Sequence, residues 1–138
     1  MRIAWHGREG ALHFLLMDEP VVSRRAVSAD IILLLDKDGR PVRVDALRLA
    51  AVPGVAYDAR EDLLDFHLRE GEARRRVHVL PGMVAWLGPE GEALSIHLLA
   101  ARQEWHVPLE DIVLLEPRAV KVGGGNLTTS AAFSTDRR

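Results

Sequence analysis

The chain contains no cysteine and few aromatic residues, and each absence limits what the protein can do. Without cysteine it cannot form disulfides, thiolate zinc sites or a thiol nucleophile. Only 5% of its residues are aromatic, which argues against a surface that binds single-stranded nucleic acid by base stacking. No apolar run reaches the length of a membrane span, and the start of the chain lacks the apolar core of a signal peptide. We therefore expect a cytoplasmic protein with no membrane partner.

The overall charge is also small. The formal net charge of −2 is too low to indicate a nucleic-acid or membrane partner. Hydrophobic residues make up 48% of the 138 residues, enough for a buried core. This length suits one compact domain or two small ones.

The most informative feature that is present is an internal repeat. Residues 3–50 align with residues 55–102 without a gap, at an offset of 52 positions. Eleven of the 48 aligned pairs are identical, whereas ordinary composition gives about three or four. The identical pairs are Ala4/Ala56, Arg8/Arg60, Glu9/Glu61, Leu12/Leu64, Phe14/Phe66, Leu16/Leu68, Arg24/Arg76, Val27/Val79, Leu35/Leu87, Gly39/Gly91 and Leu47/Leu99.

Each copy is predicted to form five short strands separated by turns. In the second strand, the alternating Leu12, Phe14 and Leu16 predict a core face, as do the identical residues of the other copy. The fourth segment, 31–35, fits either a strand or part of a helix. Its counterpart 83–87 lies between Pro-Gly and Gly-Pro, which favours a strand inside a sheet. The expected strands are 3–5, 12–16, 24–27, 31–35 and 42–47, and 55–57, 64–68, 76–79, 83–87 and 94–99.

These elements predict a mainly β fold, α+β at most. Two copies of a five-stranded unit would be related by a pseudo-twofold and share one sandwich or barrel-like core. The expected organisation is repeat copy one at 1–52, repeat copy two at 53–106, a turn and strand packed on the core at 107–120, and a flexible tail at 121–138.

The second copy also carries a familiar motif. Residues 57–66, Tyr-Asp-Ala-Arg-Glu-Asp-Leu-Leu-Asp-Phe, resemble the opening of a small bacterial family known as domain of unknown function 2283. The acidic turns with glycine at 36–39 and 90–91, and the strands that follow them, resemble a second part of that family's pattern. The resemblance covers roughly residues 3–102 as two units. It implies a fold and no activity.

Motifs for catalysis or metal binding are weak. The six histidines include no pair with the His-x-x-x-His spacing, so we expect surface or packing roles. Asp36-Lys37-Asp38-Gly39 resembles the start of a calcium loop, but the twelfth position is Leu47, which favours a hairpin turn. There is no nucleophile elbow or phosphate loop. No catalytic residue, metal or cofactor is expected.

Two surface features remain as candidate binding sites. The first is basic: Arg74, Arg76 and His78 would share one strand face, with Arg75 beside them. Arg24 and Arg25 lie at or beside the equivalent place in copy one, so a basic groove could cross the pseudo-twofold. The alternative is a solvated edge strand whose charges prevent aggregation. The second feature is apolar: Leu15 and Met17 occupy positions that are polar in copy two, which predicts an interface.

We therefore expect a non-catalytic interaction or assembly module whose partner is itself or another protein. The alternative is a nucleic-acid-binding module that uses the arginine-rich strand. A third possibility is a small-molecule cavity between the copies, lined by Trp5, Tyr57 or Trp86.

Overall fold

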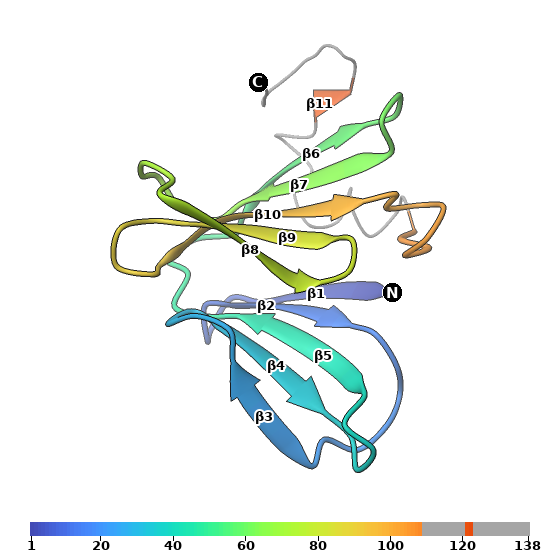
Figure 1. Cartoon of the computed structure of the whole chain (residues 1–138). Coiled ribbons are helices and arrows are strands. Elements are labelled where there is room, and N and C mark those ends of the chain that lie inside the picture. Colours follow the sequence, from blue (N-terminus) through green and yellow to red (C-terminus); the bar gives the residue numbers. More distant parts are fainter. Residues whose placement is uncertain (109–120, 123–138) are drawn as a thin grey trace.

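Two β-sheets form the protein, one from each sequence repeat (Figure 1). The computed structural model describes residues 1–108 and 121–122. The first sheet contains β1 (Arg2–His6), β2 (Ala11–Leu15), β3 (Ser23–Ala26), β4 (Ile31–Leu35) and β5 (Pro41–Ala46). The second contains β6 (Gly54–Asp58), β7 (Leu63–His67), β8 (Arg75–Leu80), β9 (Met83–Leu87), β10 (Ala93–Leu99) and the short β11 (Lys121–Val122).

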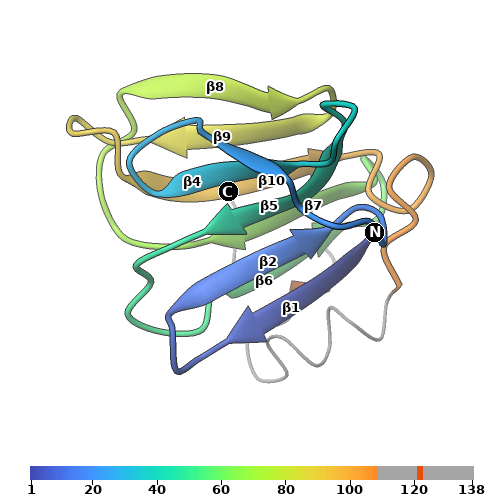
Figure 2. The same cartoon turned by 90° about the horizontal axis from the view of Figure 1, so that it is seen from below.

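The strands of both repeats follow the same order in their sheets. The first sheet runs β1-β2-β5-β4-β3, and the second runs β6-β7-β10-β9-β8 with β11 added beside β6. All pairs are antiparallel except β11 with β6. One sheet lies over the other in Figure 2. The structure is thus a sandwich of two units related by a pseudo-twofold, and the mainly β prediction is confirmed.

The two units also share details of their backbones. Gly39 and Gly91 have φ angles of 77° and 83°, as the hairpin turns require. Arg48 and Ala100, again 52 positions apart, both have positive φ although neither is glycine. Hydrogen bonds repeat with the same offset: Leu47 N–H donates to the Asp30 carbonyl at 2.8 Å, and Leu99 N–H to that of Gly82 at 2.9 Å.

The core lies between the sheets, where the residues predicted to face inward are buried, except that Leu16 is only partly buried. Phe14 and Phe66 meet edge to face with ring centroids 5.2 Å apart, and both are fully buried. Each such aromatic pair stabilises by about 0.5–1.5 kcal/mol beyond its buried area. The predicted inward residues of β5 and β10 are buried as well: Val42, Val44, Ala46, Leu94, Ile96 and Leu98.

The three aromatic residues expected to line a small-molecule cavity between the copies do not come together around one. Trp5 and Tyr57 pack against the core, and Trp86 lies on the outer face of the second sheet, opposite Ser95 and Arg76. Between the sheets, the Phe14 and Phe66 rings pack directly against each other.

Part of the predicted C-terminal organisation falls outside the described residues. This applies to 109–120, within the predicted turn and strand, and to 123–138, within the predicted tail. At Lys121–Val122 the chain pairs in parallel with Ala56 and Tyr57 of β6.

Candidate binding surfaces

The arginine-rich strands do not meet across the pseudo-twofold. β3 carries Arg24 and Arg25, β8 carries Arg75 and Arg76, and all four side chains are exposed. The strands are edges of different sheets, and they lie well apart in Figure 1. The structure therefore provides two separate basic edges in place of one groove.

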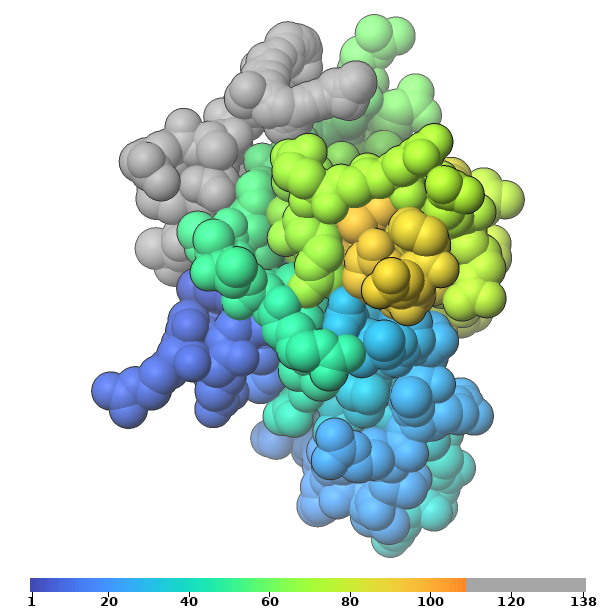
Figure 3. All heavy atoms as spheres, turned by 90° about the vertical axis from the view of Figure 1, so that its left-hand side faces the viewer, coloured from blue at the N-terminus to red at the C-terminus, as the bar shows by residue number. Residues whose placement is uncertain are grey.

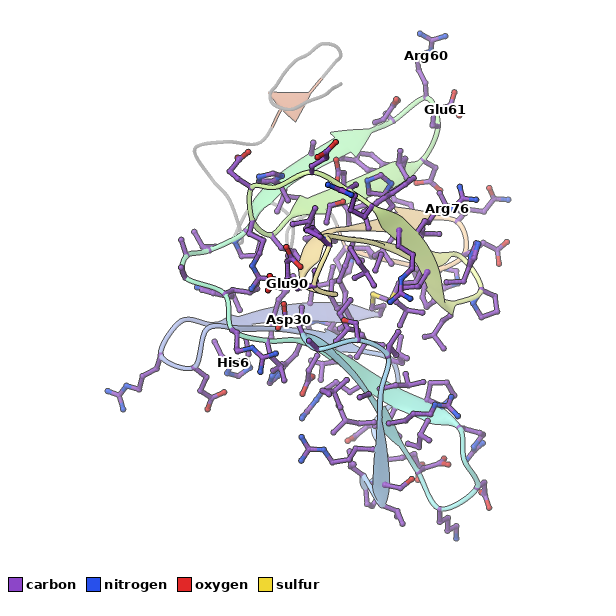
Figure 4. The ribbon with its side chains drawn as sticks, turned by 60° about the vertical axis from the view of Figure 1, so that its left-hand side comes forward. His6, Asp30, Arg60, Glu61, Arg76 and Glu90 are labelled. Carbon is purple, nitrogen blue, oxygen red and sulfur yellow. The ribbon has the colours of Figure 1, made fainter. Side chains whose placement is uncertain are left out.

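The β8 arginines lie beside aromatic rings. The Arg76 guanidinium lies 5.6 Å from the centre of the Trp86 ring. The His97 ring, on the neighbouring strand, has its centre 6.2 Å from that of Trp86. Arg76 points outward from the sheet in Figure 4. Arg74 is exposed and lies 3.6 Å from Glu72. With Arg76 stacked on it and His97 close by, the Trp86 ring offers little free area for a nucleic-acid base.

Most histidines lie on outward strand positions, as predicted. His6 and His13 stack with ring centres 4.3 Å apart. Burial lowers the pKa of His13, while the nearby Asp45 carboxylate acts in the opposite direction. In the described part of the chain, no group of three or more histidine or carboxylate side chains could hold a metal ion.

The acidic segment at 36–39 forms a hairpin turn in which protein donors surround the buried Asp36 carboxylate. The backbone N–H groups of Asp38 and Arg40 donate to Oδ1, and Arg40 Nε donates to Oδ2, each at 2.9 Å. These bonds, first that from the Arg40 backbone, lower the pKa of Asp36. The hairpin is the structure that the sequence favoured at this position.

The exposed apolar residues are concentrated on the first unit. Of the five large hydrophobic side chains that are exposed in the described residues, four belong to this unit and one, Leu99, to the second. The four lie at the end of β2 and in the segment leading to β3, and we call them the apolar patch: Leu15, Met17, Val21 and Val22, with exposed fractions of 36%, 37%, 43% and 65%. Leu15 and Met17, which the sequence predicts to lie in an interface, are thus only partly covered by the rest of the chain.

The equivalent positions of the second unit are mostly polar. At an offset of 52, the apolar patch corresponds to His67, Arg69, Ala73 and Arg74. Exposed charges lie within and beside the apolar patch: Asp18 and Glu19 stand between Met17 and Val21, and Arg24 and Arg25 follow Val22. Next to Leu15 in the strand register, Arg43 Nε donates to Asp45 Oδ1 at 2.8 Å, and Arg43 Nη2 to Oδ2 at 3.1 Å. The surface around the apolar patch therefore combines exposed apolar groups, exposed charges of both signs and one two-point ion pair.

Sequence reasoning missed a buried ionic cluster that joins the two sheets at one end. Asp30, with a side-chain exposure of 5%, accepts from Arg69 Nη1 at 2.8 Å and from the Ala93 N–H at 3.1 Å. Arg48 Nη2 lies 2.6 Å from its other oxygen. We call Asp30, Arg48 and Arg69 the clasp. Asp30 lies at the boundary between the sheets in Figure 4, and Figure 3 shows the β9–β10 turn against the β3–β4 turn there.

The sequence did contain a signal for the clasp. Asp30 aligns with Gly82 and Arg69 with Met17, so each copy holds one charged residue, of opposite sign, that the other copy lacks. Charges that appear in only one copy, at positions close to the shared core, suggest a pair formed between the copies.

Comparison with known proteins gives no further assignment. No protein-family model matches the chain, and no curated protein or solved structure matches it. The resemblance to domain of unknown function 2283 stays a prediction. No helix in the described residues is long and apolar enough to cross a membrane.

Proposed function

We propose that the protein is a non-catalytic interaction module that associates with a second copy of itself through the apolar patch. The observation that carries this proposal is the unequal distribution of apolar groups. Four exposed hydrophobic side chains gather on one unit, where the equivalent positions of the other unit carry mostly polar groups. Burial of exposed apolar surface is the main driving force for association.

A second copy suits this surface because the exposed charges around it have both signs. Asp18 and Glu19 lie at one end of the segment that leads to β3 and Arg24 and Arg25 at the other, so two such faces related by a twofold can bring carboxylates of one copy to arginines of the other. Val22, the most exposed of the four, would gain most from being covered.

The experiment is sedimentation velocity over two orders of magnitude in protein concentration. Wild-type protein should shift toward a dimer as concentration rises. Leu15→Glu and Val22→Glu should weaken this association at least tenfold, because each places a charge in the interface.

The pseudo-twofold supplies matched controls. His67→Glu and Arg74→Glu place the same charge at the equivalent positions of the second unit and should leave association unchanged. A monomer at every concentration, or equal loss in both pairs of variants, would refute the proposal.

Nucleic-acid binding through β8 is the second candidate, favoured by the exposed Arg74, Arg75 and Arg76. It would act through phosphate contacts, because the Trp86 ring already has Arg76 stacked on it. Retention of RNA at low salt that is lost on substitution of these arginines by alanine would support this candidate. Absence of any retention at low salt would eliminate it.

A further inference from the structure

The two ends of the sandwich, although related by the pseudo-twofold, have different chemistry. One end is closed by the clasp, in which an aspartate and an arginine of the first unit meet an arginine of the second. The clasp arginine from the second unit also donates to three backbone carbonyls: Arg69 Nη1 to Ala93 at 2.6 Å, and Nη2 to Arg48 at 2.6 Å and Leu47 at 3.5 Å. Polar side chains therefore occupy the space between the sheets at this end.

At the other end, each polar partner has been replaced by a residue that cannot make the same contact. Gly82 stands in the place of Asp30, Ala100 in that of Arg48, and Met17 in that of Arg69. Pro41 stands in the place of Ala93 and has no N–H to donate. The three residues of the clasp thus have no polar counterparts at the equivalent positions of this end.

A cavity of about 440 Å³ that is open to solvent is found there instead. Most of its lining residues come from the start of the first strand, the β8–β9 turn and the loop after β10. Figure 1 shows the N-terminus of the chain near that turn and that loop. This volume falls in the range of about 300–1,000 Å³ that is usual for small-molecule sites. The lining is mostly apolar: Met1, Leu16, Pro41, Leu80, Pro81 and Trp105, with Glu104 and His106.

The wall formed by Trp105 is held in place from two sides. The Met1 ammonium donates to the Trp105 carbonyl at 2.8 Å. The indole packs against Gly82, where a Cβ atom would lie 3.2 Å from Nε1. Because Gly82, the residue equivalent to Asp30, has no side chain, the Trp105 indole can lie against its backbone and form one wall of the cavity.

From this geometry we propose that the cavity binds a small neutral aromatic molecule of one or two rings. The apolar walls favour a hydrocarbon surface, and the indole of Trp105 provides a partner for stacking. Among the lining residues, Glu104 carries a carboxylate and Met1 an ammonium, so the charged groups favour neither an anion nor a cation. The lining contains none of the four side chains of the apolar patch and none of the β8 arginines, although Leu16 lies between Leu15 and Met17 in the chain. Ligand binding at a fixed protein concentration is therefore measured separately from self-association, and either can fail without the other.

The test uses the three tryptophans of the chain, whose indole N–H groups give three NMR signals in ¹⁵N-labelled protein. Indole is titrated into the full-length chain at a fixed protein concentration. The Trp105 signal should shift and saturate, while that of Trp86 on the outer face should not move. Nuclear Overhauser contacts from the probe to the methyl groups of Leu16 and Leu80 should locate it in the cavity.

A matched pair of substitutions completes the design. Trp105→Leu should weaken indole binding by about twofold to tenfold, the share that an aromatic partner contributes, and Trp86→Leu should leave it unchanged. Failure of the Trp105 signal to saturate, or equal shifts of all three signals, would overturn the proposal. Because the contacts to Leu16 and Leu80 are measured on the unchanged chain, the test stands even if a variant does not fold.

Discussion

At the scale of single residues, Tyr57 and Asp62 show how burial and hydrogen bonding alter an ionisable pair. The Tyr57 hydroxyl donates to Asp62 Oδ1 at 2.6 Å, and the backbone N–H groups of Arg102 and Gln103 donate to the same carboxylate at 3.0 Å. Burial, helped by the Asp62 carboxylate, raises the pKa of Tyr57 from 10.0 to about 12. Burial acts to raise the pKa of Asp62 too, but the hydrogen bonds outweigh it and the pKa is lowered.

Tyr57 is the only tyrosine of the chain, so its ionisation can be followed directly. The phenolate absorbance of the folded protein should rise with a midpoint near pH 12, and that of the urea-unfolded protein near pH 10. Since the folded pKa is the higher one, this group's contribution to stability is complete below pH 10. It should be lost as the pH rises through about 12, and this loss should be absent in Tyr57→Phe. A folded-state midpoint near pH 10 would contradict the account of this pair.

Residues with a simple periodic pattern were predictable from the sequence, and residues defined by long-range partners were not. Alternation identified Leu12, Phe14 and their counterparts as core because a strand presents every second residue to one face. Asp30 gave no such pattern, because its partner Arg69 lies 39 positions away and belongs to the other sheet. The apolar patch was half predicted: Leu15 and Met17 followed from the comparison of copies, whereas Val21 and Val22 did not.

At the scale of elements, the clasp joins the turn between β3 and β4 to the start of β10. Asp30 is almost fully buried, whereas the Arg48 side chain is 64% exposed and the Arg69 side chain 24%. The Ala93 N–H and the Arg69 guanidinium both donate to this carboxylate, which is the anionic partner of Arg69. The energetic importance of the clasp should therefore be concentrated in Asp30 and Arg69.

Asp30→Ala should lower the free energy of unfolding by about 3 kcal/mol, because it leaves a partly buried guanidinium without its carboxylate. Arg48→Ala should cost less than about 1 kcal/mol, because that partner is largely in water. Urea denaturation of the two variants beside the wild type measures both values. Similar small losses in both would show that the clasp does not join the sheets energetically.

At the scale of the whole molecule, two like scaffolds carry unlike surfaces. Strand order, turn conformations and core positions agree between the units. These features were predictable because an ambiguous segment in one copy could be interpreted from the aligned segment of the other. The arrangement of the two sheets was not predictable in detail, because it depends on how side chains of both inner faces pack. For that reason the expected basic groove did not form: packing placed β3 and β8 on separate edges.

The unlike surfaces suggest a division of roles. The first unit presents the apolar patch, the second has mostly polar groups at the equivalent positions, and the two ends of the sandwich differ as clasp and cavity. In each case, the proposed interaction lies where the two copies differ.

The most direct measurement of the central claim is a set of amide NMR spectra recorded at low and high protein concentration. If the apolar patch mediates self-association, concentration-dependent shifts will map to β2, β3 and the segment 16–22 that joins them. Spectra in which the shifts instead map to β7 and β8, or that do not change with concentration, would contradict it.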